Sequence, residues 1–438
     1  MTAIPRRRRT RSLIALSLAV ILIATAGVLV GVAVGTLRNS QAGEAVGIDD
    51  RPVSYLPSTP NALLAVVGDD GELTSIVVTT LLPSGRGGTI VTMPVNADMN
   101  SGVGDEAMPL GVAFDQLEFD EFVGRVESML TIGIERAERV DDERLAELVA
   151  PVVPIDVVLP EDVVNSSDLG TGIVAVDGEQ ELRGSLVVDV LTATDVDGSA
   201  YDHHAADLAV WSGLAANAPV PVSSEIARDE FGEPVPPASV DDLVQRLWEA
   251  PVQVRDLQII AFDVPADGDD STTGDTDASV DVVRVDHRDT VLVFAQISPA
   301  LVSTPNPALS FRLELGFAEE QLIEGGAEFE NVSDLARQLI GELLFLGANV
   351  VSIDLTETPG GAQTTTDIAV ANEWFLVDMN EFASLLFGES NVEIATELID
   401  GVDVVVVLGT DYLRREADRD EITESSAAGP DDTVDLDE

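Results

Sequence analysis

The longest apolar run in the chain lies near its start. Residues Leu13 to Leu37 form a stretch of 25 residues with no charged side chain, rich in Leu, Ile, Val and Ala. A helix needs about 20 such residues to cross the hydrocarbon core of a bilayer, so the pattern predicts a transmembrane helix over residues 13–37. A cleavable signal peptide is the alternative, although its apolar stretch is normally only about 7–15 residues long.

Shorter apolar runs, separated by turn residues, occupy residues 61–262. Three of them predict buried strands that form a meander: Asn61–Val67, Ser75–Leu82 and Thr89–Met93. Three- and four-residue spacing of apolar positions then predicts helices, and one further run predicts a strand, in the order 119–130, 143–149, 155–159 (the strand) and 208–214. We expect a mixed sheet with covering helices, large enough to enclose an apolar cavity.

Residues 282–414 alternate between strand-like and helix-like patterns. The predicted strands are Thr290–Gln296, Ala308–Gly316, Asn349–Asp354, Asp367–Ala371 and Asp403–Leu408. The predicted helices are Leu335–Leu346, which follows capping side chains at 331–334, and Met379–Phe387, with Phe382, Leu385 and Leu386 directed inward. This alternation is typical of a small α/β sandwich, and the whole chain is expected to belong to the α/β class.

Segments without apolar periodicity separate and follow these parts. They are a linker at 38–60, an acidic linker at 263–281 and a disordered acidic tail at 415–438. The Asp-rich stretch Pro265–Ser279 also suggests a calcium loop, but an EF-hand needs Gly at its sixth position and an acidic residue at its twelfth. Counted from Asp267, those positions hold Thr272 and Ala278, which favours a linker.

The composition excludes several classes of function. The chain has 79 acidic and 23 basic residues, and every basic residue is Arg, so the formal net charge is −56. A nucleic-acid binder needs clustered Lys or Arg, and nucleic acid is therefore not an expected partner. The absence of Cys removes disulfides, thiolate metal sites and a Cys nucleophile. With only three histidines, a His-built zinc site is also not expected.

The charge is divided unevenly along the chain. Residues 1–12 contain the one basic cluster, with five Arg residues, and this segment is expected to stay in the cytoplasm. Beyond Arg38 there are 17 Arg against 79 acidic residues, a net charge of −62, and this bulk is expected outside the membrane. Such a surface repels anionic lipids and favours cationic partners or divalent ions, with salt adaptation and plain solubility as the alternatives.

Residues 61–262 carry several motifs in a particular order. They are NALLAVVGD from Asn61, SIVVTTLLPSGRGGTIVTMPVNADM from Ser75, the segment from Val126 to Val163, VDGEQEL from Val176 and AADLAVWSGLA from Ala205. Their order resembles the extracellular domain of the LytR-CpsA-Psr (LCP) family. The resemblance implies a membrane-anchored phosphotransferase that moves a glycan polymer from a polyprenyl diphosphate carrier to peptidoglycan, with Mg or Mn. In that family Arg side chains hold the diphosphate and Asp residues position the metal.

Most of those charged residues are replaced here. The chain has Glu72-Leu73-Thr74-Ser75 where the family has Arg-x-Asp-Thr, and Asn96 closes a segment that in the family ends in Arg-Asp. The helix that offers Arg in the family reads Asp202-His203-His204-Ala205-Ala206-Asp207. A diphosphate would meet acids and neutral groups in such a site. We therefore assign no catalytic residue and expect only a remnant of a diphosphate or metal site, made of Asp69, Thr74, Asn96, His203 and His204.

Two parts of this region have simpler interpretations. Adjacent positions on a helix face about 100° apart, so His203 and His204 form a poor chelate for a metal, and an exposed helix surface is expected for them. Arg86 lies in the Gly-rich turn PSGRGG, where it could contact an anion. A solvated turn Arg is the expected setting.

Two strings in residues 282–414 carry a second resemblance. They are LARQLIGELLFLGANVVSID from Leu335 and DVVVVLGTDY from Asp403, and they are similar to the LytR C-terminal domain. The resemblance implies binding of a partner or of the wall, and no clear catalytic role. Asp411 and Tyr412 are candidates for surface recognition, with termination of a strand as the alternative.

Three functional hypotheses follow. The first is a single-pass envelope protein with a non-catalytic binding or scaffold role in wall-polymer assembly, which would contact a polyprenyl lipid carrier or a wall glycopolymer. The second is an active phosphotransferase with a rearranged site that uses Mg or Mn. The third is a sensor or regulator of the envelope. The missing Arg positions argue against the enzyme, while the sequence does not separate scaffold from sensor.

Overall fold

The computed structural model describes the chain in ten stretches. They are 51–100, 107–167, 170–194, 200–220, 226–230, 232–261, 282–299, 309–325, 329–356 and 362–417. The described residues from Val53 onward belong to one compact unit. No helix within the described stretches is long and apolar enough to cross a bilayer. The predicted membrane span at 13–37, the acidic linker at 263–281 and residues 418–438 lie outside them.

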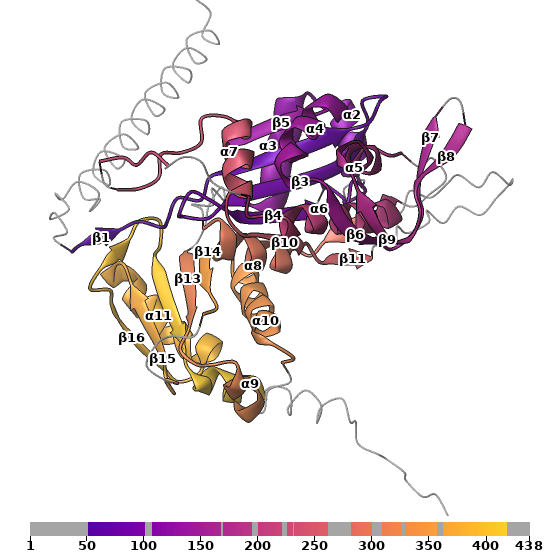
Figure 1. Ribbon diagram of the computed structural model, residues 1–438. Helices are drawn as coiled ribbons and strands as arrows, with labels where there is room; N and C mark the ends of the chain where they lie inside the picture. Colours follow the sequence, from indigo (N-terminus) through magenta and orange to yellow (C-terminus); the bar gives the residue numbers. More distant parts are fainter. Residues whose placement is uncertain are drawn as a thin grey trace, which may run out of the picture. The chain divides into compact units, whose positions relative to one another are not determined.

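A five-stranded mixed sheet lies at the centre of residues 53–261 (Figure 1). Its spatial order is β10 (Val252–Asp256), β4 (Gly88–Met93), β3 (Leu73–Leu81), β2 (Asn61–Val67) and β5 (Arg136–Val140). The pairs β2–β3 and β3–β4 are antiparallel, whereas β10 lies parallel to β4 and β5 lies parallel to β2. The predicted meander and the predicted mixed sheet are confirmed.

Helices cover both faces of this first sheet. One face packs against α2 (Leu110–Gln116), α3 (Phe119–Leu130) and α8 (His287–Ile297). The other packs against α4 (Asp142–Val149), α5 (Gly184–Leu191), α6 (Ala200–Ala216) and α7 (Val240–Trp248). The adjacent residues Leu63 and Leu64 are both buried because they enter opposite cores. Burial on both faces explains the unbroken apolar runs of these strands.

Shorter elements complete this part. Next to α5 and α6 lie two antiparallel pairs: β6 (Ile155–Leu159) with β9 (Gly178–Leu182), and β7 (Val163–Ser167) with β8 (Gly170–Ala175). A short 3-10 turn, Ala150–Val152, connects α4 to β6. Two further pairs join distant segments: β1 (Val53–Ser54) with β17 (Leu398–Ile399), and β11 (Ile259–Ala261) with β12 (Val283–Val285).

A second five-stranded mixed sheet lies in residues 309–408. Its order is β14 (Asn349–Asp354), β13 (Ser310–Leu315), β18 (Val404–Leu408), β15 (Thr366–Val370) and β16 (Ser390–Ile394), with β15–β18 as the antiparallel pair. In β13, Phe311, Leu313 and Leu315 are buried, while Arg312 and Glu314 between them are partly exposed. The buried set shares one core with α8, α10 (Val332–Phe345) and α11 (Glu373–Phe387). The short helix α9 (Glu320–Gly325) follows β13.

The prediction of a strand at Thr290–Gln296 is wrong, because these residues lie in helix α8. The Asp286 side chain caps this helix by accepting from the backbone N–H of Arg288, and the Thr290 hydroxyl donates to the Asp286 carbonyl. Both sides of α8 are buried, in the cores of the first and second sheets. A short apolar run covered on both sides looks the same as a buried strand in sequence.

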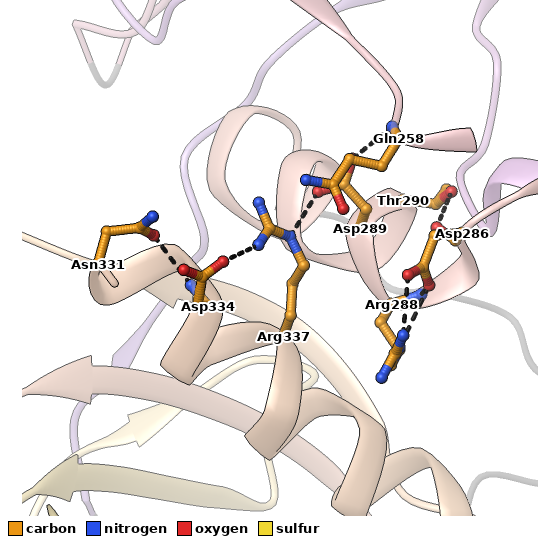
Figure 2. A network of polar contacts seen from close by, with 8 residues as sticks. All are labelled: Gln258, Asp286, Arg288, Asp289, Thr290, Asn331, Asp334 and Arg337. Carbon is orange, nitrogen blue, oxygen red and sulfur yellow. Dashed lines mark hydrogen bonds and ion pairs between the residues drawn. The ribbon is translucent and has the colours of Figure 1, made fainter. Parts of the chain in front are cut away.

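A polar network holds α8 in place (Figure 2). The buried Asp289 carboxylate accepts from the backbone N–H of Gln258 and from Arg337 Nε of α10, each at 2.9 Å. Arg337 also pairs with Asp334, which lies in the first turn of α10 after the Asn331 cap. The network therefore links α8, α10 and the segment between β10 and β11 through one buried carboxylate.

Helix α11 differs from the prediction made for this segment. Helix α11 begins at Glu373 and turns Met379, Ala383 and Phe387 inward, while Phe382 and Leu385 are exposed and Leu386 is partly buried. The prediction that Phe382 and Leu385 point inward is wrong, because the helix is apolar on both sides and its pattern does not fix the buried face.

The end of the described chain is a helix. Residues 410–417 are helical, so residues 415–417, predicted to belong to the tail, are ordered and Glu416 is buried. Tyr412 is fully buried and Asp411 nearly so, with Asp411 paired to Arg414. Neither residue lies on the surface as a recognition site would require, and both belong to a helix rather than to a strand-ending turn.

Candidate functional site

The polar residues of the first sheet gather at one of its edges. Strands β2, β4, β5 and β10 end there and β3 begins there, as the register shows: Val67 lies beside Leu73, Ile76 beside Met93 and Thr92 beside Asp256. Ligands of open α/β sheets commonly bind outside the carboxyl ends of strands. Two groups of side chains occupy this edge, an acidic pocket and a histidine cluster.

The acidic pocket is a cavity of about 450 Å³. Five carboxylates line it, three from the turn between β2 and β3, one from the start of α4 and one from α5: Asp69, Asp70, Glu72, Asp142 and Asp189. Neutral groups complete its wall, from the β7–β8 hairpin and the end of α5: Asn165, Ser166, Val174, Thr192 and Thr194. No Arg or His lines the pocket in the part of the chain that the structure describes.

The carboxylates of the pocket disfavour one another's charge. Burial raises the pKa of Asp142 above its usual value, and the negative charges of Asp69 and Asp189 raise it further, while a hydrogen bond from Thr192 lowers it. Burial and the charge of Asp69 likewise raise the pKa of Asp189. The pocket therefore repels anions and gains from the arrival of positive charge.

Of the five predicted site residues, Asp69 alone lines this pocket. Thr74 is buried at the start of β3, and its hydroxyl donates to backbone carbonyls, at 2.9 Å from Leu191 O and 3.3 Å from Val66 O. Asn96 is buried after β4, where its backbone carbonyl accepts from the N–H of Val283. Thr74 thus ties β3 to α5, and Asn96 belongs to the segment that meets β12.

The histidine cluster lies on α6, which packs across β6 and β10. His204 Nε2 is 2.8 Å from Asp256 Oδ1, and His203 Nε2 is 3.4 Å from Asp207 Oδ1. His204 is buried and His203 mostly so, which makes the expectation of an exposed helix surface wrong. The two rings face different carboxylates, in agreement with their predicted unsuitability as a chelate. Among the described residues no group of three or more His, Asp or Glu is arranged to hold a metal.

Asp207 is the functional candidate that sequence reasoning missed. It is fully enclosed, and burial raises its pKa well above the usual value, although a hydrogen bond with Ser75 opposes this. Trp211 Nε1 also donates to Ser75 Oγ, at 3.4 Å. An Asp four residues after a His, directly before the apolar run Leu208–Trp211, is the sequence signal that could have identified it.

The cluster contains the residue types of a hydrolase triad in another arrangement. In that mechanism an imidazole touches the hydroxyl and takes its proton, and the carboxylate lies behind the imidazole. Here the Asp207 carboxyl lies next to both the Ser75 hydroxyl and the His203 ring. Ser75 is also buried within β3. The geometry therefore favours a structural role over nucleophilic catalysis.

Arg86 also differs from its prediction as a solvated residue. Its Nε lies 2.8 Å from Oε2 of Glu249, a buried residue at the end of α7. The pair ties the turn between β3 and β4 to α7. Arg86 therefore pairs with Glu249 and does not contact the acidic pocket, which lies at the other end of β3.

Comparisons with known proteins add structural neighbours. No family model matches the chain, and no curated protein matches it. TagV of B. subtilis is 17% identical with a TM-score of 0.34, and the match covers 48% of this chain and 89% of TagV. YwtF (TagT), described as a LytR-CPS2A-Psr family protein with bound octaprenyl pyrophosphate lipid, is 14% identical with a TM-score of 0.34 over 54% of this chain and 88% of its own.

A third neighbour, Lin1025 from Listeria innocua, is 15% identical with a TM-score of 0.32, and the match covers 54% of this chain and 96% of Lin1025. Similarity at this level assigns neither a family nor an activity. The residues of the sheet edge must therefore carry the functional argument.

Proposed function

We propose that this chain is a single-pass membrane-anchored protein of the cell envelope that binds a component of wall-polymer assembly and does not process it. The apolar stretch Leu13–Leu37 behind an Arg cluster supports an anchor with the N-terminus in the cytoplasm and the bulk outside. The LCP-like order of motifs in residues 61–262, followed by strings similar to the LytR C-terminal domain, supports the wall-polymer setting.

The acidic pocket is the observation that carries the non-catalytic role. A polyprenyl diphosphate brought into this pocket would meet five carboxylates and no Arg among the described lining residues. The carboxylates would repel the negatively charged diphosphate, and the charge-assisted hydrogen bonds from Arg that hold a diphosphate are missing. Burial raises the pKa of Asp142 and of Asp189, and the negative charge of Asp69 raises both further.

The same pocket suits a ligand with amine and hydroxyl groups. Its carboxylates attract an ammonium group, and the side chains of Asn165, Ser166, Thr192 and Thr194 offer donors and acceptors for sugar hydroxyls. An amine-bearing wall glycopolymer combines both features. Its binding, without transfer, is the proposed activity.

The full-length chain in lipid nanodiscs tests this proposal. We expect it to retain an amine-bearing glycopolymer and to retain the N-acetylated form of the same polymer less well. The variant with Asp69→Asn, Asp142→Asn and Asp189→Asn should lose about tenfold in affinity, because three ion pairs of about 0.5 kcal/mol each disappear. The matched control changes three acidic residues of the β6–β9 ladder, Asp156→Asn, Glu179→Gln and Glu181→Gln, and should bind as the parent chain does.

A transfer assay addresses the enzymatic alternative. The chain receives a polyprenyl diphosphate-linked glycan, peptidoglycan and Mg or Mn, and release of the polyprenyl phosphate and transfer of the phosphoglycan to peptidoglycan are measured. Neither should rise above the protein-free blank. Turnover that disappears in the triple Asn variant would instead establish an active phosphotransferase with a rearranged, metal-dependent site.

A further inference from the structure

Helix α11 is apolar on two opposite sides. One side enters the core of the second sheet through Met379, Ala383 and Phe387. The opposite side exposes four large apolar side chains, which we call the α11 ridge: Trp374 (69% exposed), Val377 (63%), Phe382 (54%) and Leu385 (67%). At 1.5 Å per residue the ridge spans about 16 Å, or three helical turns.

Such a ridge is unusual on the surface of a protein with 79 acidic residues. Single exposed apolar residues need no explanation, but four large apolar side chains on one face of a helix mark an interaction site. Positions 374, 377 and 385 repeat with the spacing by which amphipathic helices pack against one another, and Phe382 widens the stripe.

Charge identifies the kind of partner. Helix α11 carries Glu373, Asp378 and Glu381, all exposed, and it contains no basic residue. Two copies packed through this face would bring six carboxylates together, and an anionic bilayer would be repelled in the same way. The chain's own residues 418–438 are acidic and are disfavoured for the same reason.

We propose that the α11 ridge is the docking surface for a cationic amphipathic helix of another protein. The apolar face of that helix covers Trp374, Val377, Phe382 and Leu385, while its Lys and Arg side chains pair with Asp378 and Glu381, which lie among these residues on the same face. The proposal concerns the second sheet and does not depend on the ligand of the acidic pocket.

Trp374 provides a built-in measurement. The chain has three tryptophans, and Trp211 and Trp248 are each 1% exposed, so an aqueous quencher reaches Trp374 selectively. The probe is a Trp-free synthetic helix of about 18 residues with Leu on one face and Lys on the other. Added to the full chain in phosphatidylcholine nanodiscs, it should shift the Trp374 emission to shorter wavelength and protect it from acrylamide.

Two control peptides separate ridge binding from general attraction to an acidic protein. A peptide with Glu in place of Lys should give no protection, since its charge is wrong. A Lys-rich peptide of equal charge without an apolar face should bind the chain and leave Trp374 open to acrylamide. The variant Val377→Ser/Leu385→Ser should weaken protection about a hundredfold, because each of the two lost apolar contacts is worth about tenfold. Ile173→Ser, at another exposed apolar position on β8, should have no effect.

Three results would overturn the proposal. Equal protection by all peptides, or by the Ser variant, would mean that the ridge is not the contact. If the parent chain forms a dimer without peptide and the Ser variant is monomeric, a second copy of the chain is the occupant. Quenching of Trp374 by brominated lipid in the nanodisc would identify the bilayer instead.

Discussion

The two five-stranded sheets of this chain differ in how they meet their surroundings. Helices cover the first sheet on both faces, and every residue of β2, β3 and β4 is buried. The second sheet packs its helices on one face, and its strands β13 and β18 alternate between buried and partly exposed residues. An enclosed sheet leaves only its edge for chemistry, whereas a half-covered sheet presents a free face and the backs of its helices.

The placement of polar residues follows this difference. In the first part the acidic pocket and the histidine cluster lie where strands end, because helices cover and bury both faces of the sheet. In the second part the notable feature is an apolar one, the α11 ridge on the outer side of a covering helix. Both proposals follow this difference, with a polar ligand at the edge of the first sheet and a protein surface on a helix of the second.

The largest expected effect is the loss of stability on truncating core residues, which tests whether one or both faces of each sheet are covered. In β2, both Leu63→Ala and Leu64→Ala should lower the free energy of unfolding by about 2–5 kcal/mol, since each leaves a cavity in a different core. In β13, Leu313→Ala should have a similar effect, whereas Glu314→Ala should change stability by less than about 1 kcal/mol. Denaturant unfolding followed by circular dichroism measures all four. Equal losses at Leu313 and Glu314 would contradict the one-sided core.

The next effect contrasts a buried ion pair with a partly exposed one. Arg337→Ala leaves the buried Asp289 carboxylate without its cation and should cost about 3 kcal/mol of stability. Arg312→Ala removes the pair with Glu314 on the less covered face, where both side chains are about a quarter exposed, and should cost under about 1 kcal/mol. Comparable losses in the two variants would show that Asp289 is solvated when Arg337 is absent.

The pH dependence of stability should reveal the raised pKa of Asp207. Its pKa is raised in the folded protein by burial, so its contribution is complete below the pKa of the unfolded chain and is lost as pH rises through the folded pKa. The slope of that loss is at most about 1.4 kcal/mol per pH unit. Asp207→Asn keeps the shape without the charge, and should become more stable than the parent chain as pH increases.

Denaturant unfolding at several values between about pH 5 and pH 8 measures this effect. Asp156→Asn, at an exposed position of β6, serves as the control and should leave the slope of the parent chain unchanged. An Asp207→Asn variant that follows the parent at every pH would show that the buried carboxyl remains ionised beside Ser75 and His203.

Much of the fold could be predicted from apolar patterns, and the failures have a common cause. The strands at 61–67, 349–354 and 404–408 are flanked by turn residues, which fix their type and limits. The run at 290–296 was ambiguous because a segment covered on both sides has no polar face to reveal its period. The same ambiguity affected α11, whose apolar residues lie on both its buried and its exposed side.

The site was less predictable than the fold because it depends on contacts between distant segments. Asp69 could be found from its position after a strand, but its companions Asp142 and Asp189 come from helices about 70 and 120 residues further along the chain. A sequence read alone gives no reason to group them. The burial of His204 depends likewise on β10, which brings Asp256 beside it.

The smallest effect concerns the coupling among the pocket carboxylates. Asp69 raises the pKa of both Asp142 and Asp189, so Asp69→Asn should move both pKa values down toward their usual range. A carboxyl group whose pKa is raised in the folded state lowers the free energy of unfolding as pH increases, so the variant should be more stable than the parent chain at neutral pH. The gain should be only a few tenths of a kcal/mol, because these groups remain largely solvated. Carboxyl carbon NMR titration resolves each residue. Unchanged Asp142 and Asp189 titrations would mean that burial alone sets their pKa, and that the pocket's preference for cations arises from its desolvated walls and not from the number of its charges.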